Sequence, residues 1–246
     1  MNSTACLQLD VGNSSAKWRL VCADEVVARG HYHHEDAALR ETLLNSCDTV
    51  AQIWIASVAG AVREAQISEL LTHRWGVQPW FARTPPRTGD LINSYEQPGR
   101  MGVDRWLVML AARARCSGRS CVVDCGSALT IDLVAADGRH EGGFIIPGPE
   151  LMERALLLDT DRVRFDEIPR YALQPGVSTA EAVYHGTALA QVGAVALALD
   201  RAVGEPPELL FTGGGGHMVQ ALLDRGGEWV EDLVFEGLEL MAAEVH

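Results

Sequence analysis

The sequence predicts an α/β fold built from two related halves, and three observations support this prediction. A strand–turn–strand–strand unit occurs twice, with the turn sequence DVGNS at residues 10–14 and DCGSA at residues 124–128. Internal similarity on this scale indicates duplicated structure. Strand-like and helix-like segments alternate after each unit. The composition, 48% hydrophobic and 22% charged, is typical of a chain that folds around a core.

The first half is predicted as residues 1–115 and reads as β-β-β-α-β-α-β, followed by a long loop and a helix. The expected strands are 7–10, 17–21, 26–31, 53–58 and 78–81, and the expected helices are 36–46, 63–75 and 101–115. The loop at 82–100 is rich in Pro, Gly and Arg. Because structureless loops of this length are uncommon in compact domains, we expect it to serve function.

The second half is predicted as residues 116–246 and repeats the order. Expected strands cover 121–124, 130–135, 139–145 and 209–211, and expected helices cover 150–158, 179–203, 217–223 and 234–245.

Charge and composition exclude several classes of protein. The formal net charge of −13 repels phosphate backbones, so we expect no nucleic-acid partner. No secretory signal and no run of about 18 apolar residues is present, which predicts a cytoplasmic protein without a membrane partner. The six cysteines lack CxxC spacing and are interpreted as reduced and structural. His31, His33 and His34 lack further metal ligands, so we expect an exposed strand end there.

The turn after Asp10 is a candidate phosphate site. Gly12 allows close backbone approach, and successive N–H groups in such a turn bind phosphate oxygens. Ser14 and Ser15 add hydroxyls, and Lys17, the only lysine of the chain, adds charge. A carboxylate such as Asp10 holds Mg²⁺, usually through water. An ordinary Gly-Asn hairpin turn explains the same residues equally well.

The second turn, 124–130, has the same features as the first. Because two such turns occur in related halves, phosphate or cation binding is favoured over the alternative that Asp124 merely caps a turn. A third glycine segment, 212–216, lies between an expected strand and an expected helix. It is interpreted either as a surface for a nucleoside or phosphate, or as a flexible loop.

Residues 102–105, GVDR, begin a helix after the long loop. Asp104 can accept or orient the proton of an attacking hydroxyl, and Arg105 can bind an anionic substrate. Taken alone, however, this tetrapeptide is better explained by Asp104 capping the helix and Arg105 lying at the surface.

The set of motifs, in this order, resembles the type III pantothenate kinases, of the acetate and sugar kinase, heat-shock chaperone and actin superfamily. The matching segments span most of the chain, and the second and third of them together are the most specific. They are DVGNS at 10–14, Tyr95 with PGRMGVDR at 98–105, DCGSA at 124–128 with Thr130 and Asp132, GGFIIPG at 142–148, Ser178 and Thr179 with Gly186, and TGG at 212–214.

The resemblance implies two duplicated ribonuclease-H-like (actin-like ATPase) halves with an interdomain cleft, and a homodimer. It also implies a kinase that uses ATP with Mg²⁺ to phosphorylate pantothenate to 4′-phosphopantothenate, the first step of coenzyme A biosynthesis. Asp104 would be the catalytic proton acceptor, and Asp124 would bind a monovalent cation, K⁺ or NH₄⁺. ATP would contact Asp10, Val11, Gly12, Asn13, Ser14, Ser15, Ala16, Lys17 and Ser127. Pantothenate would contact Tyr95, Gly102, Val103, Asp104, Arg105 and Thr179.

Two positions depart from the family pattern. The family usually has Thr where this chain has Ser127, which retains the hydroxyl. It often has Asp where this chain has Gly215, which predicts weaker nucleotide binding or relaxed nucleotide choice.

Three alternatives stay open at this point. Another small-molecule kinase would share the fold. A non-catalytic nucleotide-binding regulator of the Bvg accessory factor type would lack turnover, and the intact Asp104–Arg105 pair argues against it. A nucleotide-gated chaperone would need a client-binding domain for which the chain seems too short.

Overall fold

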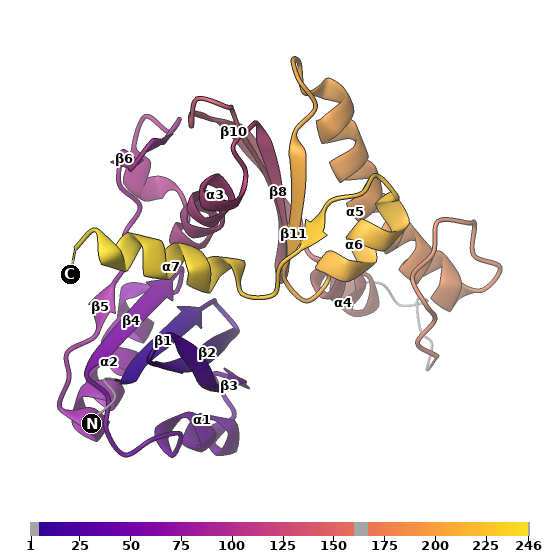
Figure 1. Cartoon of the computed structure of the whole chain (residues 1–246). Coiled ribbons are helices and arrows are strands. Elements are labelled where there is room, and N and C mark those ends of the chain that lie inside the picture. The colour runs from indigo at the N-terminus through magenta and orange to yellow at the C-terminus, as the bar shows by residue number, and fades with distance from the viewer. Residues whose placement is uncertain (1–4, 160–166, 246) are drawn as a thin grey trace. The chain divides into compact units, whose positions relative to one another are not determined.

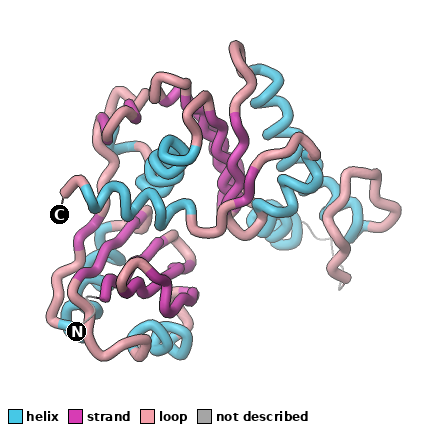
Figure 2. The backbone as a smooth tube through the Cα atoms, viewed as in Figure 1, coloured by secondary structure: helices cyan, strands magenta, loops and turns pink. Residues whose placement is uncertain are grey.

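The computed structural model describes residues 5–159 and 167–245. These residues form two compact units, each with its own five-stranded sheet (Figures 1 and 2). The N-terminal unit contains the described residues up to 88, together with 95–111 and 234–245, and the C-terminal unit contains 89–94 and the described part of 112–233. The division predicted at residue 115 stays a prediction. The contacts place the last helix, α7, in the N-terminal unit.

The sheet of the N-terminal unit has the strand order β3-β2-β1-β4-β5. Its elements are β1 (Ala5–Val11), β2 (Ser15–Cys22), β3 (Glu25–His33), α1 (Ala37–Leu44), β4 (Gln52–Ser57), α2 (Ala61–Trp75) and β5 (Trp80–Phe81). The first three strands are antiparallel, whereas β4 runs parallel to β1 and β5 runs parallel to β4. Alternating apolar residues such as Leu7 and Leu9 are fully buried on this sheet, so the sequence pattern and the observed strands agree.

The sheet of the C-terminal unit repeats this order as β10-β9-β8-β11-β12. Its elements are β8 (Ser120–Cys125), β9 (Ala128–Val134), β10 (His140–Pro147), α4 (Pro149–Asp159), α5 (Thr179–Arg201), β11 (Glu208–Thr212), α6 (Gly216–Leu223) and β12 (Glu228–Trp229). Strand β11 is parallel to β8, as β4 is to β1. The duplicated α/β architecture predicted from the sequence is therefore confirmed. The short strand β12 was not predicted.

The segment expected to be a long loop is partly ordered into short elements. It contains β6 (Arg87–Thr88), β7 (Leu91–Ile92) and the 3₁₀ turn η1 (Pro98–Arg100), and it leads into α3 (Val103–Arg115). Strands of two residues carry too little periodicity to be read from a sequence.

Helix α7 (Leu233–Ala243) lies against the N-terminal sheet through a polar cluster. Arg19, only 5% exposed on β2, pairs with Glu239 of α7 at 2.8 Å, and Gln8 of β1 donates to the same carboxylate at 2.9 Å. A Cβ at Gly237 would overlap the carbonyl oxygen of Leu107 in α3, so the glycine lets these two helices approach closely. A buried arginine needs a partner, and Glu239 supplies it from the far end of the chain.

One helix in the described part of the chain, α5, is long and apolar enough by length and composition to cross a membrane. Its buried residues include Val192, Val195 and Ala198, which belong to the core of the C-terminal unit. The helix thus serves as a core helix of that unit. Among the cysteines, Cys6, Cys116, Cys121 and Cys125 are buried, and Cys22 and Cys47 are partly buried.

Candidate active site

The first acidic turn joins β1 to β2 and is closed by backbone hydrogen bonds. The N–H of Gly12 donates to the Ser15 carbonyl at 2.9 Å, and the N–H of His34 donates to the Ser14 carbonyl at 3.1 Å. Asn13 and Ser14 are exposed at the tip. The turn therefore presents backbone and hydroxyl groups to solvent from a fixed frame.

His34 is a residue of this turn that the sequence analysis misjudged. It is only 9% exposed, and its Nε2 lies 2.9 Å from the Gly12 carbonyl oxygen. The expected exposed strand end is thus wrong for His34, because its side chain turns inward and braces the loop. A histidine one residue beyond a strand gives no signal of that direction in the sequence.

Asp10 lies at the end of β1, between Lys17 of β2 and Ala56 of β4 in the sheet register. Burial and, to a smaller extent, the neighbouring carboxylate of Asp104 raise its pKa from 3.8 to about 6, against the opposing effect of Lys17. Asp10 and Asp104 are therefore close enough to repel each other. Such a pair is more stable when a cation or a proton lies nearby.

The start of α3 carries Asp104 and Arg105 in fixed positions. The N–H of Arg105 donates to Asp104 Oδ1 at 2.7 Å, which holds the carboxylate over the first turn of the helix. A Cβ at Gly102 would overlap that same carboxylate oxygen, so this position requires glycine if the carboxylate is to lie there. The side chain of Asp104 therefore bonds within the first helical turn.

Arg105 is buried, with 4% of its surface exposed, and is not the surface charge that the tetrapeptide alone favoured. Its Nη1 donates to the Tyr95 hydroxyl at 2.8 Å, and its guanidinium lies 5.8 Å from the centre of the Tyr95 ring. A buried guanidinium held by a tyrosine is a preorganised site for an anionic or polar group.

A pocket of about 280 Å³ opens beside this helix start. It is lined by the segments that follow β4 and β5 and by η1 and the start of α3: Ser57, Val58, Ala59, Ala82, Arg83, Thr84, Gly99, Arg100, Met101, Gly102 and Val103. The hydroxyl of Thr84 donates to the Met101 carbonyl at 2.9 Å and fixes one wall to the other. The volume suits a small organic molecule, and two of the predicted substrate residues, Gly102 and Val103, line it.

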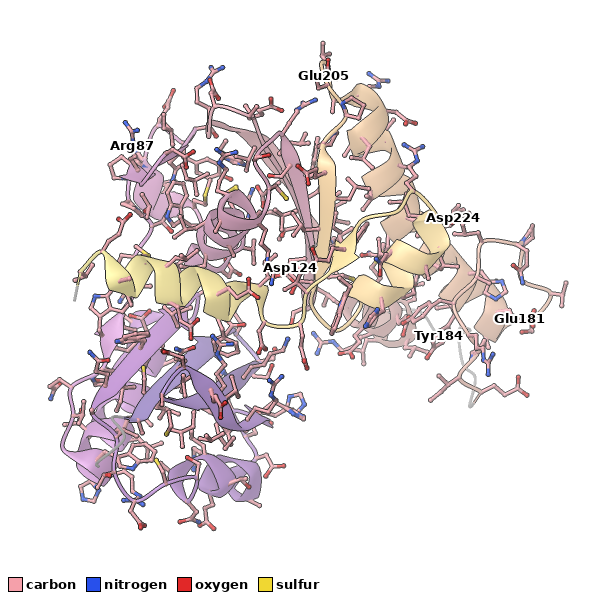
Figure 3. All side chains as sticks on the ribbon, viewed as in Figure 1. Arg87, Asp124, Glu181, Tyr184, Glu205 and Asp224 are labelled. Carbon is pink, nitrogen blue, oxygen red and sulfur yellow. The ribbon has the colours of Figure 1, made fainter. Side chains whose placement is uncertain are left out.

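The second acidic turn joins β8 to β9 and is enclosed by glycines. Asp124, labelled in Figure 3, pairs in register with Thr130 of β9 and Thr212 of β11. Gly213 has φ +78, and a Cβ there would lie 2.5 Å from Asp124 Oδ1. A Cβ at Gly148 would overlap the Gly126 carbonyl oxygen. Backbone thus packs directly around the carboxylate and the turn.

The glycine segment after β11 forms a tight turn into α6. The N–H of Gly215 donates to the Cys125 carbonyl at 2.8 Å, and a Cβ at Gly215 would overlap the Cys125 sulfur. This contact gives a physical reason why the position lacks a side chain. The ring of His217 stacks on Trp229 at 3.8 Å, beside the same turn.

Of the other predicted residues, Val11 and Ala16 are buried, whereas Ser127 and Thr179 are exposed. Ser127 lies in the second turn, and its carbonyl accepts from Gly148 N–H at 3.0 Å. Thr179 is the first residue of α5, next to the cap Ser178, whose hydroxyl accepts from Glu181 N–H at 3.2 Å. Within the N-terminal unit the structure brings Asp10, Asp104, Arg105 and Tyr95 together. In the C-terminal unit the structure places Asp124 against Gly213 of the glycine segment.

A duplicated sheet with an acidic glycine turn after the first strand of each copy defines the actin-like class of ATPases and kinases. A solved activator of 2-hydroxyisocaproyl-CoA dehydratase from Clostridium difficile, with bound ADPNP, has this fold, with a TM-score of 0.55 over 98% of this chain and 95% of its own, at 10% identity. A Campylobacter jejuni protein described as of the Baf family of transcriptional activators reaches a TM-score of 0.61 over 97% and 98% of the two chains, at 22% identity. At these identities the likeness concerns the fold alone.

Sequence similarity is more specific. Residues 6–201 match the family model for type III pantothenate kinase. The type III pantothenate kinase of Pseudomonas syringae is 37% identical over 243 residues, covering 95% of this chain and 97% of the relative. That of Pseudomonas aeruginosa is 36% identical with the same coverage. This chain belongs to the type III pantothenate kinase family.

Proposed function

We propose that this protein transfers the γ-phosphoryl group of ATP to the primary hydroxyl of pantothenate, giving 4′-phosphopantothenate and ADP. The observation that carries the proposal is the pairing, at one helix start, of the Asp104 carboxylate with the buried Arg105–Tyr95 contact beside a pocket of small-molecule size. Family membership supplies the substrate and the phosphoryl donor.

In the proposed reaction the hydroxyl oxygen of pantothenate attacks the γ-phosphorus, the bond to ADP breaks, and Asp104 accepts the hydroxyl proton. The hydrogen bond from Arg105 N–H fixes one carboxylate oxygen and so sets the direction of the acceptor. Phosphoryl transfer depends mainly on positioning and on neutralising charge, so a fixed acceptor is the chief contribution of this helix.

Pantothenate carries one carboxylate and several groups that accept hydrogen bonds. We assign its binding to Tyr95, Gly102, Val103, Asp104 and Arg105, with Thr179 as a further contact. Arg105 is already desolvated and bonded to Tyr95, so little side-chain entropy is lost when an anionic or carbonyl group binds there.

The first turn, from Asp10 to Lys17, is assigned to the phosphates of ATP, with Ser127 as a second contact. The residues fit Mg²⁺, because Asp10 is a half-buried carboxylate whose pKa is raised first by burial and then by the second carboxylate, Asp104, so a cation would stabilise its charged form. When bound, Mg²⁺ would offset the charge of the phosphates. Asp10 would hold it, usually through water.

A monovalent cation, K⁺ or NH₄⁺, is assigned to Asp124. The carboxylate lies against bare glycine backbone at Gly213, in a setting of carbonyl oxygens that includes that of Cys125. Oxygen ligands with a single negative charge suit a monovalent ion, which would further neutralise the phosphates.

A cytoplasmic homodimer completes the proposal. Leu189 and Leu197 of α5 are 59% and 57% exposed, and their spacing of eight places them on one helix face. A second copy would cover this apolar face. Sedimentation at several protein concentrations would measure the mass of the assembly.

The first test is a coupled assay of ADP release with Mg-ATP, with and without pantothenate, in K⁺ and then in Na⁺. We expect release that requires pantothenate and is faster in K⁺. A folded protein that binds ATP without turnover in any salt would contradict the kinase assignment. That result would favour a non-catalytic regulator of the Bvg accessory factor type.

A further inference from the structure

The pocket at the start of α3 belongs to the N-terminal unit alone, because its lining residues fall within 57–59, 82–84 and 99–103. Two of these lining residues, Arg83 and Arg100, are basic, and none of them is Asp or Glu. The chain as a whole carries a formal net charge of −13. The charge of this lining is therefore opposite to that of the whole chain, and it favours an anionic ligand.

Arg83 is already paired within the same unit. Its Nη1 and Nη2 donate to the two carboxylate oxygens of Glu64 at 3.0 and 2.5 Å. The guanidinium also lies 5.2 Å from the centre of the Phe81 ring. A bidentate carboxylate offsets the charge of the arginine and occupies its paired donors. Arg83 therefore adds little attraction for a ligand anion.

Arg100 differs from Arg83 because only its backbone is held. Its N–H donates to the Gln97 carbonyl at 3.0 Å, and the N–H of Met101 donates to the Pro98 carbonyl at 3.0 Å. Among the residues that the structure describes, none forms an ion pair with the Arg100 guanidinium, and the residue is exposed. The pocket thus has one arginine whose charge is not offset by a carboxylate.

Ser57 supplies a second donor to the pocket. It is 8% exposed, and its Oγ accepts from the Ala59 N–H at 3.3 Å. A hydroxyl that accepts in this way still has its own O–H to donate. The other lining hydroxyl, that of Thr84, already donates to the Met101 carbonyl. The side-chain donors left for a ligand are therefore the Arg100 guanidinium and the Ser57 hydroxyl, a pair suited to a carboxylate.

We propose that Arg100, with Ser57 as a second donor, binds the carboxylate of pantothenate and selects the acid over neutral analogues. This assignment rests on the function proposed above. Pantothenate has its primary hydroxyl at one end and its carboxylate at the other. Asp104, the proposed proton acceptor, directly follows the lining residue Val103, so a substrate whose hydroxyl lies at Asp104 has the pocket beside it for its other end. Arg105 is then left for the carbonyl groups of the substrate.

The test compares Arg100→Gln and Arg100→Lys with the wild-type chain on two substrates, pantothenate and panthenol. Panthenol keeps the primary hydroxyl and has a CH₂OH group in place of the carboxylate. In Arg100→Gln we expect KM for pantothenate to rise about tenfold, with kcat and the KM values for panthenol and ATP within about twofold. Lysine keeps the charge without the planar fork, so KM for pantothenate should rise only about threefold.

Arg87→Gln is the matched control, since Arg87, labelled in Figure 3, is another exposed arginine of this unit and does not line the pocket. It removes the same charge from the chain and should leave the KM values unchanged. An equal rise in Arg87→Gln would show that overall charge is responsible and would overturn the proposal. An unchanged KM for pantothenate in Arg100→Gln, or equal rises for pantothenate and panthenol, would overturn it as well.

Calorimetric titration with pantothenate, without ATP, separates this proposal from the kinase assignment. If the wild type binds pantothenate but does not phosphorylate it, the proposed function fails, and the carboxylate site is judged by Kd alone. A Kd about tenfold higher in Arg100→Gln than in the wild type supports the site. Equal Kd values in the two chains, or no measurable binding to the wild type, refute it.

Discussion

The two acidic turns share a sequence unit but differ in what packs around them. The first turn is open: a Cβ at Gly12 would meet only the Ser15 carbonyl, at 3.4 Å, and its carboxylate Asp10 is crowded by the negative charge of Asp104. At the second turn the backbone of Gly213 is pressed against Asp124, whereas Gly126 and Ser127 at the tip are exposed. Duplicated local structure therefore yields one turn whose carboxylate lies near a second carboxylate and another whose carboxylate lies against glycine backbone, which agrees with their different proposed roles.

The largest expected effects come from removing the charge of Asp104, which lies near the first turn, and the charge of Asp124 in the second turn. Asp104→Asn should lower kcat by about 10²–10⁴, because the amide cannot accept the proton, and should leave KM for ATP nearly unchanged. Asp124→Asn should instead raise the K⁺ concentration for half-maximal activity by about tenfold or more. Steady-state kinetics across a K⁺ series would distinguish the two.

Asp200→Asn, at an exposed residue of α5, is the control for these substitutions. Normal turnover of Asp104→Asn would show that the assigned catalytic role is wrong. An unchanged K⁺ dependence in Asp124→Asn would show that the cation does not bind at the second turn.

The next effect concerns packing. Gly213→Ala places a side chain at φ +78, 2.5 Å from the Cys125 carbonyl oxygen, and should destabilise the protein by about 2–4 kcal/mol. Gly12→Ala has no positive φ and only a 3.4 Å neighbour, so its cost should stay within about 1 kcal/mol.

Urea unfolding would measure both variants, with Gly214→Ala as the control, because a Cβ at Gly214 meets nothing within 4 Å. Equal costs for Gly12→Ala and Gly213→Ala would mean that the two turns are packed alike, and the comparison would fail.

The smallest effect is a gain in stability from Asp10→Asn. The folded pKa of Asp10, about 6, exceeds its ordinary value of 3.8, so the folded state binds more protons between these two values. Stability of the wild type therefore falls as pH rises from about 4 to 6, and the cost is complete above pH 6. Removing the charge should stabilise the unliganded protein at pH 7 by on the order of 1–3 kcal/mol.

Thermal unfolding from pH 3.5 to 8 would follow this effect, and the advantage of Asp10→Asn should disappear at the acid end. If the difference in stability between Asp10→Asn and the wild type were the same at every pH, packing and not charge would be its cause. Kinase activity should nevertheless be lost in this variant, since the amide is a poor ligand for Mg²⁺.

Much of the fold was predictable because its signals are local. Alternating apolar residues, the repeated acidic turns and the helical spacing of the long segments gave the duplicated order of strands and helices, with boundaries shifted by a few residues. Helix α7 was also predicted, whereas its place against Arg19 and Gln8 depends on Glu239, more than 200 residues away. No local pattern carries that pairing.

The residues assigned to the proposed site come from the sequence motifs, whereas several of their physical properties could not be read from those motifs. The tetrapeptide at 102–105 favoured an exposed Arg105, yet burial and the Tyr95 hydroxyl make it a preorganised donor. The inward orientation of His34 and the hydrogen bonds of His140 with Asp132 and Ser94 were not predicted either, since a histidine looks the same in sequence whether it braces a turn or faces solvent.

The sequence by itself determined the duplicated α/β fold and the order of motifs that identifies a type III pantothenate kinase, since both depend on residues close together in the chain. The tertiary structure alone decided which charges are crowded, which glycines are enclosed and which side chains are buried. These properties depend on residues far apart in the chain, and burial then sets the pKa of Asp10, the need for glycine at 213 and the bonded state of Arg105.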